Sequence, residues 1–283
     1  MIALAMPALT MAQTPFGGFM KGKGKGDVVI SYNSESYDQV FLVPQKINGV
    51  PVFNKVQINS VNLFSTIGIS KKLDLQMSIP YVKATGAASP EVLTNLGYSN
   101  ERKGLQDVSL YLKYNPLNCK AGKGNIAFIG ALGLQAPLGN YKVDESLQSV
   151  LAIGNRATQL NTYIMAQYKL DMGLFLNGSL GYSSRSGVVP DATLSQLKVG
   201  YAGKAFYVDV FVASQESTSG VDILKEGFTA VFPATKVSYQ RAGASLFVPV
   251  GKGFGVTAGY STYLNGRNIG QSSGGNGGLV YSF

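Results

Sequence analysis

The sequence of 283 residues predicts an all-β protein: an antiparallel transmembrane β-barrel of about twelve strands, with short periplasmic turns and long external loops. Two observations support this fold class. Apolar and polar residues alternate within segments of roughly ten residues, as strands require when one face meets lipid and the other meets water. The connections between these segments are alternately very short and long, an order that a soluble fold has no reason to keep.

Composition favours the same class. Charged residues make up 14% of the chain, well below the ~25% that is typical of soluble domains. No stretch approaches the ~18 to 20 apolar residues of a transmembrane helix, so any membrane passage must use strands. Barrels of this length are commonly one domain, and no linker divides the chain.

The predicted strands follow one another with the same two-faced pattern. The first places Val28, Ile30 and Tyr32 on one face and Ser31 and Glu35 on the other. The full set is expected, in chain order, at 27–35, 61–70, 73–81, 107–115, 126–136, 160–170, 174–182, 194–201, 206–214, 237–248, 254–264 and 279–283.

The sequence makes specific predictions for two of the connections. The strand from 107 is expected to end at Asn115-Pro116, which places the single cysteine, Cys119, in a turn. A glycine-rich loop is expected between residues 265 and 278.

The last strand carries Leu279, Tyr281 and Phe283, an alternating apolar and aromatic run that is typical of barrel closure. We expect these three residues to form the signal that the barrel-assembly machinery recognises. The predicted location is the outer membrane of a Gram-negative bacterium, with outer-membrane lipid as the surrounding partner.

The chain before the barrel is expected to have two parts. Residues 1–12 are apolar and end in Thr10-Met11-Ala12, which indicates a signal peptide whose basic leader is truncated. Residues 13–26 are expected to form a flexible N-terminal segment, and residues 27–283 the barrel. The alternative for the first residues is a short core segment.

The formal charge of +9 does not indicate a nucleic-acid partner, because the basic residues are scattered and many fall on the predicted periplasmic side. They are interpreted mainly as solvated lysines in turns. Attraction to anionic headgroups or to anionic solutes is the alternative.

Catalysis and cofactor binding are not expected. The chain has no His, which removes His-dependent catalytic triads and His-based metal sites. One thiol cannot make a disulfide or a redox pair. We therefore predict that the protein is not an enzyme and uses no cofactor or metal.

Charged side chains on the predicted inner face are candidates for lumen selectivity. A constriction that selects solutes by charge is one interpretation, and a polar interior that fills or wets the barrel is the other. Twelve strands lie between a filled eight-stranded barrel and an open pore of sixteen strands, so a narrow or gated path is expected. The candidates are Glu35, Asp107, Lys113, Lys169, Lys198, Asp209 and Arg241.

Three motifs carry a family resemblance: 78–81 (SIPY), 104–114 (GLQDVSLYLKY) and 134–141 (LQAPLGNY). Together they resemble the family of outer-membrane barrels associated with the meta-pathway of phenol degradation. That family shows a PY strand end, a G-x-x-D-x-x-L-x-x-K-Y strand and a P-T-G strand exit, in which Leu138 replaces the Thr here. The resemblance covers about residues 73–141 and implies uptake of small hydrophobic or aromatic compounds.

The leading hypothesis is therefore an outer-membrane transport barrel for small hydrophobic or aromatic compounds. The loop at 137–157 and the segment at 13–26 are its candidate gates. The alternative hypothesis is a structural barrel with an occluded lumen, whose external loops bind a partner or stabilise the membrane.

Overall fold

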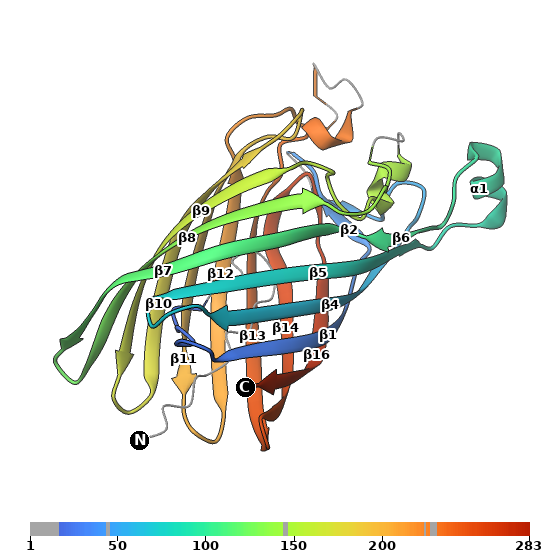
Figure 1. The fold of residues 1–283 in the computed structure, drawn as a ribbon. Helices are drawn as coiled ribbons and strands as arrows, with labels where there is room; N and C mark the ends of the chain where they lie inside the picture. The colour runs from blue at the N-terminus through green and yellow to red at the C-terminus, as the bar shows by residue number, and fades with distance from the viewer. Residues whose placement is uncertain (1–16, 44–45, 144–146, 224, 227–230) are drawn as a thin grey trace.

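The computed structural model describes residues 17–43, 46–143, 147–223, 225–226 and 231–283, which form a closed antiparallel β-barrel (Figure 1). Within this part of the chain, twelve strands make the wall, and the β4–β5 pairing closes the circle. Around the barrel they are β4 (Val56–Gly68), β1 (Gly26–Tyr37), β16 (Ser273–Ser282), β14 (Phe254–Arg267), β13 (Ser238–Gly251), β12 (Tyr207–Ser217), β11 (Ala192–Ala202), β10 (Leu174–Arg185), β9 (Gln159–Leu170), β8 (Gly124–Pro137), β7 (Asp107–Ala121) and β5 (Leu73–Gly86).

The connections alternate in length as predicted. Short turns at 69–72, 122–123, 171–173, 203–206 and 252–253 share one end of the barrel with the start of β1 and the end of β16. We call this the periplasmic end. The connections at the opposite, external end are mostly long, although the one between β10 and β11 spans only residues 186–191 and the one between β14 and β16 only residues 268–272.

The terminal strands close the wall where the sequence predicted. In the β1–β16 ladder, Tyr281 lies opposite Val28 and Leu279 opposite Ile30. Gly26 and Phe283 exchange two backbone hydrogen bonds of 3.0 Å at the edge of this ladder. Recognition of these residues by assembly machinery stays a prediction.

The predictions for two connections are wrong. The expected glycine-rich loop is largely strand, because β16 begins at Ser273; glycines show no apolar alternation, so the pattern could not reveal it. Likewise β7 continues past Pro116 to Ala121, which puts the exposed Cys119 in a strand. A register shift between Tyr114 and Leu117 accommodates the proline, as bulges do.

The outer wall is apolar. Large hydrophobic side chains along the strands are exposed, from Ile30 on β1 to Ile164 on β9 and Leu279 on β16. A belt of this kind is stable only where lipid covers it. The described residues contain no helix that is long and apolar enough to cross a membrane.

The remaining elements lie at the external end. β6 (Glu101–Leu105) pairs antiparallel with the external end of β5, and α1 (Pro90–Leu96), capped by Ser89 and Gly97, precedes β6. A small sheet joins β15 (Ile269–Gly270), β2 (Gln39–Phe41) and β3 (Lys46–Asn48). Two short 3-10 helices occupy Gln148–Leu151 and Phe232–Ala234. Apolar side chains of two loops pack together here on β4 and β5, namely Val50, Phe53, Val56, Val82, Ala84, Tyr141, Leu151 and Ile153.

Candidate functional site: the barrel lumen

The periplasmic half of the lumen holds the chain that precedes β1. The ammonium of Lys113 donates hydrogen bonds to the carbonyls of Gly17 (3.2 Å) and Phe19 (2.6 Å). The Gln167 side-chain amide donates to the carbonyl of Gly18 (3.2 Å). We call residues 17–21 the plug. Residues 1–16, which include the predicted signal peptide and the start of the predicted flexible segment, lie outside the described residues.

Buried charges hold the plug to the wall. Lys21, expected to be solvated, is instead buried and forms an ion pair with Asp27. Its backbone N–H donates to Asp74 Oδ2 (3.0 Å), and Lys113 Nζ lies 3.6 Å from the same oxygen. Two cations thus face two carboxylates in a site without solvent access. Removing one member of such a group leaves an uncompensated buried charge.

An aromatic cluster holds the middle of the plug. The Phe19 ring packs edge-on against Phe175 (centroids 5.2 Å apart) and Tyr207 (6.3 Å), which stack on each other. Lys169 Nζ lies 5.6 Å from the centroid of the Phe19 ring. The plug therefore has both apolar and polar attachments to the wall.

Lys198 and Asp209 form a separate pair on β11 and β12. The Lys198 ammonium lies 3.6 Å from Asp209 Oδ2, which also accepts a hydrogen bond from Ser245 Oγ (2.8 Å). Lys198 Nζ also lies over the Phe211 ring, 5.8 Å from its centroid. These side chains brace three adjacent strands rather than the plug.

The external half of the lumen contains a cavity of about 680 Å³, which we call the external cavity. Arg241 on β13 reaches its wall beside Tyr263, with the guanidinium carbon 5.0 Å from the ring centroid. The guanidinium donates to Glu35 Oε2 (3.2 Å) and Ser261 Oγ (2.6 Å). Gly274 stands between the strands of Ser261 and Glu35, and its missing side chain lets Arg241 reach across.

Asp107 lies on another side of the external cavity. It accepts hydrogen bonds from the Gln135 amide (3.0 Å) and from the hydroxyl of Tyr141 in the loop after β8. The Tyr141 hydroxyl in turn accepts the Arg156 N–H (3.0 Å). This carboxylate therefore attaches the loop predicted as a gate to the barrel wall.

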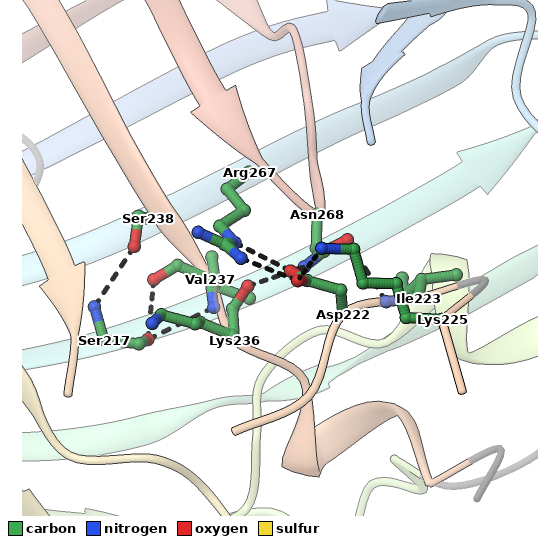
Figure 2. A network of polar contacts seen from close by, with 9 residues as sticks. All are labelled: Ser217, Asp222, Ile223, Lys225, Lys236, Val237, Ser238, Arg267 and Asn268. Carbon is green, nitrogen blue, oxygen red and sulfur yellow. Dashed lines mark hydrogen bonds and ion pairs between the residues drawn. The ribbon is translucent and has the colours of Figure 1, made fainter. Parts of the chain in front are cut away.

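A second loop is attached over the cavity by Asp222 (Figure 2). The Arg267 guanidinium donates twice to this carboxylate, at 2.7 and 2.6 Å, and the Asn268 amide donates at 2.9 Å. Lys225 Nζ lies 3.4 Å away. These hydrogen bonds, with Arg267 the largest contributor, hold the pKa of Asp222 well below its usual range. Phe232 and Pro233 of the same loop line the cavity.

The seven candidate residues thus fall into three groups rather than one constriction. Lys113 and Lys169 contact the plug, and Lys198 pairs with Asp209. The other three, Glu35, Asp107 and Arg241, line the external cavity. Asp107 and Lys113, on one strand, serve different groups and do not pair.

Sequence reasoning missed Arg185, Tyr239 and Asp74. Asp74 carried a usable signal, because Leu73 and Leu75 on either side of it point outward and an aspartate between them must point inward. Arg185 lies beyond the predicted end of its strand, at 182, so its direction had no basis in the pattern.

The comparisons with known proteins agree with this architecture. An outer-membrane channel of Pseudomonas putida F1 is similar in structure, with a TM-score of 0.69 at 14% identity over 92% of this chain and 96% of that one. The translocator domain of the autotransporter NalP from Neisseria meningitidis gives 0.50 at 13% identity, over 93% and 90%. A comparison with curated protein sequences finds no match.

The solved structures show the fold, that of outer-membrane barrels, and the apolar belt fits it. A family model matches residues 47–277, most of the chain and well beyond the three motifs. The chain belongs to the family described as "Putative MetA-pathway of phenol degradation", and it is an outer-membrane β-barrel.

Proposed function

We propose that this barrel admits small hydrophobic or aromatic compounds through the outer membrane, with the external cavity as the first binding site and the plug as the gate. The observation that carries the proposal is the division of the lumen. A cavity of about 680 Å³ lies in the external half, within the 300–1,000 Å³ typical of small-molecule sites, and the plug fills the periplasmic half.

The lining of the cavity supports the solute class. Ile58, Val82, Ile153 and Leu194 provide apolar surface, and tyrosine rings provide faces on which an aromatic solute can stack. A solute held here must pass the plug to continue to the periplasm. Passage therefore requires breaking the contacts of Lys113 with the backbone of residues 17 and 19.

Seven inward residues are proposed to act in three ways. Lys113 and Lys169 retain the plug, whereas Glu35, Asp107 and Arg241 shape the cavity and attach its loop. Lys198 and Asp209 are proposed to keep the lumen round through their pair across β11 and β12.

The test is conductance and solute flux of the chain from Gln13, the expected mature start, folded into planar bilayers and liposomes. Swelling of liposomes by a neutral aromatic such as benzamide, absent in empty liposomes, is the expected result. A correctly folded barrel that admits no aromatic or aliphatic solute refutes the transport function.

A structural barrel remains the second candidate, because buried ion pairs fill much of the lumen. For that function, replacing the external loops should abolish activity while Asp107→Ala and Arg241→Ala leave it unchanged. The transport function predicts that both substitutions alter solute flux.

A further inference from the structure

We infer, on the basis of the transport function proposed for the same cavity, that the external cavity binds aromatic solutes that carry one anionic group, such as aromatic carboxylates. Two guanidinium groups and a set of tyrosine rings carry this inference.

Among the described residues, no carboxylate lies within ion-pair distance of the Arg185 guanidinium. Its positive charge is therefore not neutralised by a direct partner. Its guanidinium donates to three neutral oxygens: Ser183 Oγ (3.2 Å), the Pro190 carbonyl (3.3 Å) and Gln215 Oε1 (2.9 Å). These bonds fix its direction without cancelling its charge. The nearby Asp191 carboxylate instead accepts the Arg185 backbone N–H (2.7 Å) and the hydroxyl of Tyr182, which lies on the lipid face.

Arg241 adds a second, partly unused donor group. Its side chain is 91% buried, and only Nη2 carries the bonds to Glu35 and Ser261. Within the described residues, its Nε is buried without a hydrogen-bond partner. A buried donor of this kind is costly unless something accepts from it. The register shift between Gln240 and Arg241 turns this residue within the ladder, as bulges next to binding sites do.

The tyrosines join the two arginines into one surface. Tyr239 and Tyr263 pack edge to face, with centroids 5.0 Å apart, and both line the external cavity together with Arg241 and Arg185. Tyr163 adds a third tyrosine to this lining. Ring faces beside guanidinium forks match a solute with an aromatic body and a planar anionic head.

The cavity's own carboxylates do not favour a cation instead. Glu35 is paired with Arg241, and Asp107 already accepts donors from Tyr141 and Gln135. Asp107 and Arg185 both lack an opposite charge at ion-pair distance, but Asp107 is only 5% exposed and each of its oxygens already accepts a hydrogen bond, whereas Arg185 is only partly buried. A solute anion is therefore the complement of the charge that a solute in the cavity can reach.

The test uses three probes of nearly equal shape: benzoate (anionic), benzamide (neutral) and benzylamine (cationic). Binding to the folded barrel in detergent is measured by titration calorimetry. We expect benzoate to bind about tenfold tighter than benzamide, since hydrogen bonds between two charged groups are stronger than those to a neutral group. Equal binding of benzoate and benzamide, or tighter binding of benzylamine, would overturn the inference.

Arg185→Gln is the decisive variant, because the arginine bonds only neutral groups and its loss leaves no buried charge unpaired. It should remove the preference for benzoate and leave benzamide binding unchanged. Lys83→Gln makes the same charge change outside the cavity and should have no effect. A preference that survives Arg185→Gln refutes the role of this residue and the inference with it.

Two further measurements keep the outcomes separate. The double variant Glu35→Gln/Arg241→Gln removes both charges of that pair and should weaken benzoate binding without loss of fold, which heat-modifiable gel mobility checks. Benzamide flux into liposomes tests transport independently. Flux without a benzoate preference refutes this inference alone, whereas binding without any flux refutes the proposed transport function.

Discussion

In the periplasmic half of the lumen, buried cations face carboxylates: Lys113 and Lys21 are matched by Asp74 and Asp27. In the external cavity, Arg185 is equally fixed in place, yet its partners are neutral oxygens. The difference teaches that charge alone does not mark a binding site. Charges that are paired within the chain hold the plug in the periplasmic half. A fixed charge that a solute can reach, and that has no counterion, is available to bind the solute.

The largest effect is expected when the plug loses its main attachment. Lys113→Met removes two hydrogen bonds to the plug and leaves Asp74 with one cation fewer, which costs about 3–5 kcal/mol for buried pairs. Single-channel conductance should rise several-fold. Unfolding temperature should fall and recover when Asp74→Asn is added, while conductance stays high.

Lys169→Met is the matched control, because Lys169 touches only the Phe19 ring among the plug residues. Its conductance should rise less than that of Lys113→Met, because it loses one ring contact and no hydrogen bond to the plug. If both lysine variants conduct like the unmodified barrel, the plug does not limit passage and the comparison of the two halves loses its functional meaning.

A smaller effect is expected from crowding the base of the plug. A Cβ at Gly68 would lie 1.9 Å from the Gly22 carbonyl oxygen, so Gly68→Ala must displace the backbone just after the plug. We expect more frequent opening events in current recordings. Gly130→Ala is the control, since its nearest atom lies 4.0 Å away, and equal traces for the two variants would contradict this reading.

A substitution at Gly274, where β16 pairs with β1 in the external half, should lower the stability of the barrel. A Cβ at Gly274 would lie 2.2 Å from the Ser34 carbonyl oxygen and 2.4 Å from Glu35 Cβ, so Gly274→Ala should disturb the Arg241–Glu35 pair. We expect a loss of about 1–3 kcal/mol in unfolding free energy, as for overpacked sites. Gly275→Ala, with its nearest atom at 3.5 Å, serves as the comparison in urea titration.

The smallest effect concerns the loop that Asp222 attaches. A carboxylate whose pKa is depressed in the folded state contributes stability that is present above its unfolded pKa, about 3.9, and lost as pH falls through the folded value. Protection factors against hydrogen exchange, corrected for the intrinsic rate at each pH, should therefore be equal at pH 7 and 5 in residues 218–223 and 231–237 and fall only well below pH 4. Asp222→Asn should lower these protection factors at both pH 7 and pH 5, and a loss of protection in the unmodified chain already at pH 5 would argue against this role.

The sequence predicted the barrel because its physics is local and repetitive. Each strand must alternate between lipid and lumen, so the inward direction of Glu35, Asp107 and Lys113 could be read directly from neighbouring residues. The turn lengths fixed which end carries the loops. The prediction ended where that alternation fades, at the glycines of β16 and at the bulge after Tyr114.

Only the tertiary structure decided which inward residues meet. Arg241 and Glu35 are 206 positions apart and pair because β13 and β1 approach across two strands in the closed barrel. Lys21 was expected in solvent, but the chain before β1 returns into the lumen and buries it. Alternation along one strand determines a side chain's face, whereas its partner depends on register and closure around the whole barrel.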